Sequence, residues 1–260
     1  MINSVLYREP VLLDSVNHRG KKISPLADYS IARSLHAVFV AGAEFTQAAL
    51  EYPLVFVRSG DNDANGKPMI APVAMLGLSQ GENLFVEGER WVGRYLPAFI
   101  RRYPFLTAQL QGTDSPGVLI DAAWSGFSDE VGEPLFDAAA KPAPALTTAI
   151  QFLEMFDAEA LRTRNFCSEL LALDILQEMN ASATLPDGGK FSVDGFYVVD
   201  EAKLRALPDA TVVSLHRSGI LTLLSAHLIS LTNIRHLLDR KTRRVQMTAE
   251  VSNISTPGHA

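Results

Sequence analysis

The spacing of hydrophobic residues changes near residue 140. Before that point, short apolar runs alternate with clusters of glycine, proline, asparagine and aspartate; after it, apolar residues recur at steps of three and four. Short runs between turn residues are typical of strands, and the longer steps are typical of amphipathic helices. The pattern predicts an α+β protein whose N-terminal half is mainly antiparallel β structure and whose C-terminal half is helical with one β-hairpin.

In the N-terminal half, the apolar runs predict strands and the polar segments between them predict turns. Residues 61–66 are rich in aspartate and asparagine and end in glycine, and residues 115–117 read Ser-Pro-Gly; both compositions suit tight turns. Residues 97–103 begin with a proline and predict a short helix. The strands are expected at 11–16, 54–57, 70–78, 83–86, 105–110 and 118–122.

The C-terminal half predicts helices that are interrupted once. Three- and four-residue steps place a helix over 146–176. A Pro-Asp-Gly-Gly turn at 186–189 predicts a hairpin whose second strand runs to Val199. Asp200 then suits an N-cap for a helix at 201–206, because its carboxylate can accept from free backbone amides. Further helices are expected at 209–218 and 219–241, and the basic run 240–244 would complement the dipole at the end of the last one.

One local pattern occurs twice, with a constant offset of 51 residues. Tyr52-Pro53 precedes Gly81-Glu82-Asn83-Leu84-Phe85, and Tyr103-Pro104 precedes Gly132-Glu133-Pro134-Leu135-Phe136. The offset predicts a tandem duplication, 51–101 and 102–152, arranged about a pseudo-twofold axis. The chain would then consist of a β-rich region with this internal repeat (1–140), a helical region with the hairpin 183–199 (141–245) and a flexible tail (246–260).

The repeat brings Glu82 and Glu133 forward as candidate site residues. If both carboxylates face one cleft, they could share a proton, hold a metal or bind a cationic ligand. If they lie in two equivalent turns, they would instead accept backbone hydrogen bonds. Tyr52 and Tyr103 are candidates for the same reason, with core packing at a strand edge as the structural alternative.

Two arginines and one histidine complete the candidates. Arg101 and Arg102 precede the second Tyr-Pro and could bind an anion or form an ion pair with Glu82 or Glu133. His227 interrupts an apolar stripe on the last predicted helix. It is either a core histidine bonded to a backbone carbonyl or a serine, or a ligand-binding or catalytic residue.

Composition narrows the classes of function. The formal net charge of −6 argues against a broadly basic nucleic-acid-binding surface. Cys167 is the single cysteine, so this chain has no internal disulfide and no multi-cysteine metal site, and its apolar neighbours predict a buried, inert thiol. Residues 1–20 show no secretory signal, which predicts a cytoplasmic protein. The apolar stretch 218–234 is shorter than the about 20 residues of a membrane span.

Several longer strings resemble the SapC family of bacterial proteins. They include Glu51-Tyr52-Pro53-Leu54-Val55-Phe56, Gly195-Phe196-Tyr197-Val198-Val199-Asp200-Glu201 and Ala226-His227-Leu228-Ile229-Ser230-Leu231, together with the two Gly-Glu-x-Leu-Phe motifs. The resemblance covers about residues 10–241. It implies a genomic association with TonB-dependent receptors, halogenase-like proteins and cupin-like oxygenases, and it carries over no catalytic residue.

Two hypotheses from different classes follow. The first is a non-enzymatic binding or accessory protein of a bacterial uptake or modification system, which holds a partner protein, a peptide or a small ligand. The alternative is an enzyme that acts on a peptide or small molecule at a cleft between the two β units, using Glu82 and Glu133, with Arg101 or Arg102 anchoring an anion. No nucleotide-binding or zinc motif is present, so neither a cofactor nor a metal is expected, and self-association stays open.

Overall fold

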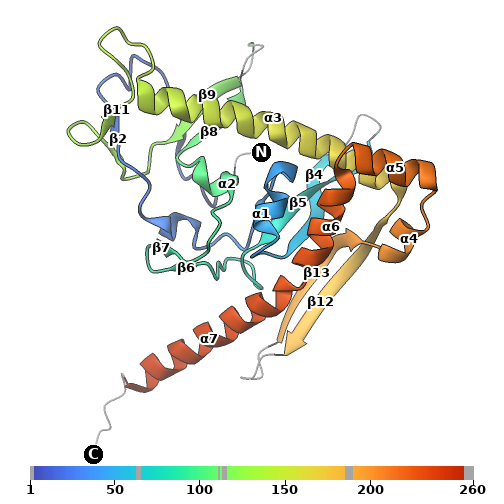
Figure 1. The fold of residues 1–260 in the computed structure, drawn as a ribbon. Coiled ribbons are helices and arrows are strands. Elements are labelled where there is room, and N and C mark those ends of the chain that lie inside the picture. Colours follow the sequence, from blue (N-terminus) through green and yellow to red (C-terminus); the bar gives the residue numbers. More distant parts are fainter. Residues whose placement is uncertain (1–2, 63–65, 111, 113–115, 185–189, 255–260) are drawn as a thin grey trace, which may run out of the picture.

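The computed structural model describes residues 3–62, 66–110, 112, 116–184 and 190–254 and has the predicted α+β fold (Figure 1). Its largest sheet has five antiparallel strands in the order β12-β13-β4-β5-β3. These strands are Leu176–Thr184 (β12), Lys190–Val199 (β13), Leu54–Asn62 (β4), Pro68–Met75 (β5) and Ala37–Phe39 (β3).

The remaining strands form smaller antiparallel sheets. One has the order β1-β9-β8, another has the order β10-β2-β11, and β6 pairs with β7. Their bounds are Pro10–Leu12 (β1), Lys22–Ile23 (β2), Val86–Glu87 (β6), Arg90–Trp91 (β7), Phe105–Gln109 (β8), Pro116–Asp121 (β9), Phe127–Ser128 (β10) and Glu133–Pro134 (β11).

The strand expected at 83–86 is largely a turn. The side chain of Asn83 accepts a hydrogen bond from the backbone N–H of Phe85 (2.9 Å) and donates to the carbonyl of Ala32 (2.9 Å). This local bond bends the chain and competes with strand pairing, so that only Val86 and Glu87 pair in β6.

One long helix, α3 (Pro144–Leu173), packs on the five-stranded sheet at β5 and on the two three-stranded sheets at β8 and β11 (Figure 1). Its 30 residues span about 45 Å at 1.5 Å per residue. The first half of the helix packs on a smaller core that contains Phe105 and Leu135. The second half contributes its own Phe166 and Leu170 to the main core. The helix was expected to reach Leu176, but the left-handed conformation of Asp174 (φ 50°) ends it, and Leu176 begins β12.

The other helices are short, except at the C-terminal end. They are η1 (Tyr29–Ala32), η2 (Gly42–Glu44), α1 (Phe45–Ala48), α2 (Ala98–Arg101), α4 (Glu201–Arg205), α5 (Asp209–Arg217), α6 (Ile220–Ser230) and α7 (Asn233–Ile254). The hairpin β12–β13 and the N-cap at Asp200, which accepts from the N–H groups of Ala202 and Lys203, agree with the sequence prediction.

The last helix departs from the prediction at both ends. The expected helix 219–241 is divided into α6 and α7 by a turn at Leu231 and Thr232. Residues 246–254, which belong to the expected flexible tail, continue helix α7; residues 255–260 lie outside the described residues. No single described helix is long and apolar enough to cross a membrane, although Asp209–Arg217 and Ile220–Met247, bent by 89°, pass that test as a pair on length and composition.

The predicted tandem repeat is not confirmed. Each copy begins with an antiparallel hairpin, but Leu54 pairs with Ala74 whereas Phe105 pairs with Ile120. At an offset of 51 residues, the position equivalent to Ala74 is Ser125. The observed partner of Phe105 lies five residues before Ser125, so the two hairpins differ in their pairing. After the hairpins, β6 pairs with β7, whereas β10 and β11 both pair with β2.

The two copies share a local motif. Gly81 and Gly132 both have positive φ (78° and 112°), a conformation that glycine adopts without strain. The Leu-Phe pair that follows each glycine is buried, Leu84-Phe85 in the main core and Leu135-Phe136 in the smaller one. The recurrence therefore marks two glycine turns, each held by an apolar pair.

His227 of α6 lies where β4 and β13 meet. These strands are paired at one position, Tyr197 opposite Phe56. The Nε2 atom of His227 accepts from the backbone N–H of Val199 (3.1 Å), so Nδ1 carries the proton and donates to the carbonyl of Leu54 (2.9 Å). The ring is fully buried. His227 is therefore a core histidine that bonds the backbones of both strands, as the structural interpretation expects.

We expect His227 to make stability depend on pH. Burial lowers its pKa from 6.5 to about 4, so below pH 6.5 the unfolded chain takes up a proton that the folded protein does not. This contribution is complete above pH 6.5 and is lost as the pH falls towards 4, by about 3 kcal/mol. Urea unfolding between about pH 7.5 and pH 4 measures it.

The matched variants are His227→Leu and His236→Leu, since His236 is exposed. His227→Leu should lower the free energy of unfolding at pH 7.5 by about 1–3 kcal/mol, because two buried backbone groups lose their partner. Its difference from the wild type should shrink as the pH falls, whereas His236→Leu should follow the wild type. A His227→Leu difference that stays constant with pH would contradict this account.

Candidate functional site

Helix α7 is attached to the body of the protein through one of its faces. Lys241 and Arg244 lie three residues apart, so their side chains share this face. Lys241 Nζ binds Glu82 Oε1 at 2.6 Å, and Arg244 donates to the carbonyls of Asn83 (2.8 Å) and Val86 (2.9 Å). These bonds fix the helix against residues 82–86.

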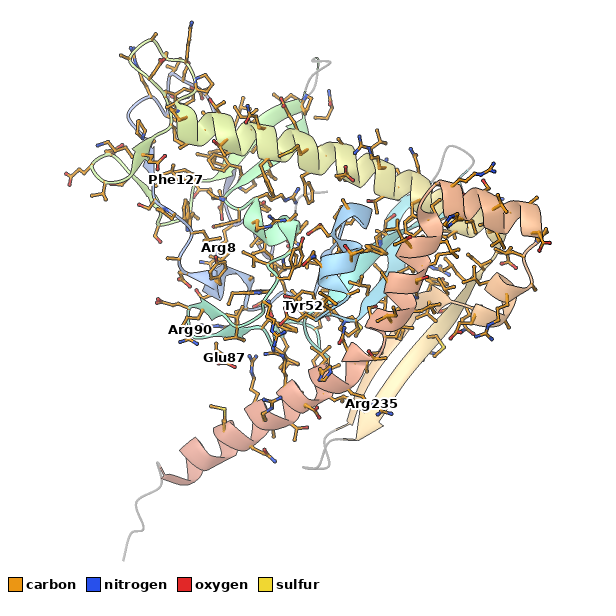
Figure 2. The ribbon with its side chains drawn as sticks, viewed as in Figure 1. Arg8, Tyr52, Glu87, Arg90, Phe127 and Arg235 are labelled. Atoms are coloured by element: carbon orange, nitrogen blue, oxygen red, sulfur yellow. The ribbon has the colours of Figure 1, made fainter. Side chains whose placement is uncertain are left out.

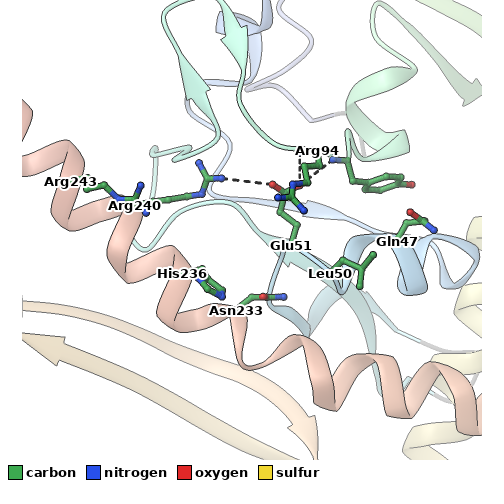
Figure 3. Close-up of a pocket in the computed structure, with 9 residues that line it drawn as sticks. Gln47, Leu50, Glu51, Arg94, Asn233, His236, Arg240 and Arg243 are labelled. Carbon is green, nitrogen blue, oxygen red and sulfur yellow. Dashed lines mark hydrogen bonds and ion pairs between the residues drawn. The ribbon is translucent and has the colours of Figure 1, made fainter.

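The adjacent face of α7 lines an open groove, which we call the α7 groove (Figure 3). Asn233, His236, Arg240 and Arg243 follow one another at steps of three, four and three, and these steps place them along one stripe. The opposite wall comes from Gln47 in α1, from Leu50 and Glu51 after it, and from Arg94 and Tyr95. The groove has a volume of about 490 Å³, which lies within the usual size range of ligand sites.

Two carboxylates hold the wall that carries Arg94 and Tyr95. Glu51 Oε2 accepts from the backbone N–H groups of Arg94 (2.7 Å) and Tyr95 (3.1 Å). Glu44 is buried, and its Oε1 accepts from the Tyr95 hydroxyl (2.7 Å) and from the N–H of Ala98 at the start of α2 (2.7 Å). The segment 94–98 is therefore fixed by acceptors from the region around α1.

The groove carries more positive than negative charge. Arg94, Arg240 and Arg243 face the single carboxylate of Glu51, which leaves a formal charge of +2 before His236 is counted. Arg240 lies 3.8 Å from Glu51, and its guanidinium stacks 4.4 Å from the centre of the Phe85 ring. Arg94 and Arg243 take part in none of the ion pairs found among the described residues.

This arrangement is suited to binding an anion. Arginine donates through a planar group that matches carboxylate and phosphate oxygens. The carboxylate of Glu51 is already engaged by two backbone amides and by Arg240, so it opposes an incoming anion less than a free carboxylate would. The groove also exposes Leu50, which is 75% accessible and offers an apolar contact beside the charges.

Two of the residues predicted from sequence support the groove from behind. Glu82 binds Lys241 and so helps to hold α7. Tyr52 is fully buried, its ring packs against Phe85 (4.7 Å), and its hydroxyl donates to the carbonyl of Tyr95. Burial raises the pKa of Tyr52, which keeps the hydroxyl neutral. Both residues are structural, because they support the walls and do not line the groove.

Four other predicted residues meet in a second cavity, which we call the Arg102 pocket. Arg101, Arg102, Tyr103 and Glu133 all line this pocket, whose volume is about 370 Å³. Glu82 lies elsewhere, against α7, so the predicted cleft with two glutamates is not found among the described cavities. The ion pairs that were expected between these arginines and Glu82 or Glu133 are also not found among the described residues.

Sequence reasoning missed the basic stripe of the α7 groove. The run 240–244 was assigned to the end of a helix, but α7 continues to Ile254, so these residues lie in its middle and the capping role is wrong. The steps between Asn233, His236, Arg240 and Arg243 are the signal that could have identified a polar face. Residues 47–51 and 94–95 are distant in sequence, and no local pattern links them to α7.

Cys167 is buried, as predicted, and burial raises the pKa of its thiol to about 12. At neutral pH the sulfur is therefore protonated and unreactive. Within the described residues, no group of three or more His, Cys, Asp or Glu side chains is placed to hold a metal ion.

Comparison with known proteins gives a match to a family model. The model of the family described as SapC matches residues 13–237. No curated protein and no solved structure matches the chain. The matched segment includes Asn233 and His236 of the α7 groove and ends before Arg240 and Arg243.

The contact between Glu82 and Lys241 can be tested by a double-mutant cycle. Both side chains are largely buried, at 15% and 20% exposure, so we expect a coupling energy of about 1–2 kcal/mol between Glu82→Gln and Lys241→Met. The exposed pair Glu201 and Arg205 is the control and should couple by less than about 0.5 kcal/mol. Chemical unfolding measures both, and a coupling near zero for the first pair would contradict the attachment of α7 described above.

Proposed function

The chain belongs to the SapC family, and we propose that this protein is a non-enzymatic binding or accessory protein that holds an anionic group of a partner peptide or small ligand in the α7 groove. The observation that carries the proposal is the pair of arginines, Arg94 and Arg243, which line an open groove and take part in no ion pair among the described residues. A protein with a formal charge of −6 would otherwise repel anions.

The groove favours binding over chemistry. Its one carboxylate, Glu51, accepts two backbone hydrogen bonds and lies beside Arg240, so it is poorly placed to take a proton from a substrate. The side chain of Asn233 is also engaged, because it donates to the carbonyls of Ala49 (2.8 Å) and Tyr52 (3.3 Å). The charged side chains left for a ligand are therefore arginine donors, and the apolar Leu50 lies beside them.

The proposed ligand carries a carboxylate or phosphate next to an apolar group. The charged group would lie between Arg94 and Arg243, and the apolar group would cover Leu50. An acidic or phosphorylated segment of a partner protein has this chemistry, and so does a small organic anion. The setting that we propose, from the family resemblance, is a bacterial uptake or modification system with TonB-dependent receptors or halogenase-like proteins as partners.

Inorganic phosphate is the simplest probe of the groove. We expect calorimetric titration at low ionic strength to detect binding that weakens as salt is added, because the contact is electrostatic. Arg243→Ala should weaken it about tenfold, as expected for the loss of a charge-assisted hydrogen bond. The matched control is Arg235→Ala, since Arg235 is exposed on the same helix and does not line the groove (Figure 2). Equal loss in both variants would indicate a general charge effect and would contradict the site.

The accessory role predicts a partner that depends on the groove. Affinity purification at native expression levels should recover the same protein with the wild type and with Arg235→Ala, and should lose it with the double variant Arg94→Ala and Arg243→Ala. Mass spectrometry identifies the partner and measures its yield. If the double variant recovers the partner as well as the wild type does, the partner does not bind at the α7 groove. If no protein is recovered specifically, the result counts against the accessory role.

A further inference from the structure

Arg102 lines its pocket, and its guanidinium also lies beside three aromatic rings that are outside the pocket lining. The guanidinium of Arg102 lies 4.4 Å from the ring centre of Phe99, 4.6 Å from that of Phe156 and 5.8 Å from that of Tyr7. Aromatic rings attract a cation through their faces but accept no strong hydrogen bond. The Nε atom of Arg102 is buried and has no hydrogen-bond partner among the described residues.

No carboxylate neutralises this arginine or its neighbour. Neither Arg101 nor Arg102 takes part in an ion pair among the described residues. Tyr7 shares a hydrogen bond with Arg102 but carries no charge, because burial raises its pKa to about 12 despite the opposing effect of the arginine. A partly buried charge is normally paired or hydrogen-bonded, because desolvation is unfavourable. An anion in the pocket would supply that compensation.

Most of the remaining pocket wall is apolar. Leu26, Phe105, Trp124, Ala149 and Phe152 contribute to it, and Phe152 also lies 5.4 Å from the guanidinium of Arg101. The pocket volume of about 370 Å³ lies at the small end of the range for ligand sites, about 300–1,000 Å³. The wall therefore suits a short apolar tail, and the arginines suit a single charged head.

We propose that the Arg102 pocket binds a small monocarboxylate with an apolar tail, with its carboxylate on Arg102 and Arg101 and its tail against the aromatic wall. Both arginines line the pocket, and a planar guanidinium can donate two parallel hydrogen bonds to a carboxylate. The tail displaces water from apolar surface, which adds to the affinity. This site differs from the α7 groove in its lining and in the chemistry of its ligand.

Glu133 provides a test of the charge of the ligand. It is exposed at the pocket wall and carries the only carboxylate among the residues that line the pocket. A carboxylate ligand would be repelled by Glu133, whereas a cationic ligand would be attracted and a neutral ligand would be little affected. Removing this charge therefore distinguishes the three kinds of ligand without disturbing the buried core.

The probe is octanoate, compared with 1-octanol as a neutral molecule of the same length, in calorimetric titrations with the full chain. We expect octanoate to bind the wild type at least about tenfold more tightly than 1-octanol, because only octanoate can pair with the arginines. Arg102→Met should remove this preference while leaving 1-octanol binding unchanged. Glu133→Gln should tighten octanoate binding by roughly threefold. Arg164→Met, an exposed arginine of α3 outside the pocket, is the control and should behave as the wild type.

Several results would overturn the proposal. The proposal is overturned if the wild type binds octanoate no more tightly than it binds 1-octanol. It is also overturned if Glu133→Gln weakens octanoate binding. If Arg102→Met does not fold, Glu133→Gln still decides the question, because Glu133 is exposed. The α7 groove is tested separately, since Arg243→Ala should leave octanoate binding intact and Arg102→Met should leave phosphate binding intact.

Discussion

The contact between α7 and residues 82–86 determines where the polar groove lies. Lys241 and Arg244 are used to attach the helix, through Glu82 and two backbone carbonyls. The stripe next to them, with Arg240 and Arg243, is thereby turned towards α1 and forms one side of the groove. Most of the stability of a helix in a protein comes from tertiary packing, so the same contact also supports the helix itself. The attachment of α7 and the α7 groove therefore both depend on how the basic residues are distributed around this helix.

The acidic side chains of this protein largely serve its own structure. Glu44 and Glu51 accept hydrogen bonds from the segment 94–98, and Glu82 holds α7. Asp121 is fully buried and accepts from the Tyr103 hydroxyl (2.7 Å) and from the N–H of Glu9 (2.8 Å). These carboxylates are committed to backbone amides, hydroxyls and lysine. Of the cavity arginines, Arg240 is paired with Glu51, whereas Arg94, Arg101, Arg102 and Arg243 take part in no ion pair among the described residues. A net negative charge is therefore compatible with local sites for anions.

Local signals in the sequence predicted individual helices and strands well. The predictions failed where the structure depends on contacts between residues that are distant in sequence. The periodicity of α3, the pairing of β12 with β13 and the N-cap at Asp200 depend on neighbouring residues, and the structure agrees with each; the turn predicted at 186–189 lies outside the described residues. The repeat was inferred from two glycine turns with the same Leu-Phe anchor, but strand pairing around them follows different partners. Arg101, Arg102, Tyr103 and Glu133 do converge, whereas the α7 groove joins three distant segments that no local pattern connects.

The two cavities are built on one support. Tyr95 lines the α7 groove, and its ring lies 5.8 Å from the guanidinium of Arg101, which lines the Arg102 pocket. Glu44 holds both sides of this junction, because one oxygen accepts from the Tyr95 hydroxyl and from the N–H of Ala98 at the start of α2. A shift of that short helix would move Arg101 and Tyr95 together. The buried carboxylate of Glu44 therefore sets the geometry of a polar site and an apolar site at once, although it lines neither cavity.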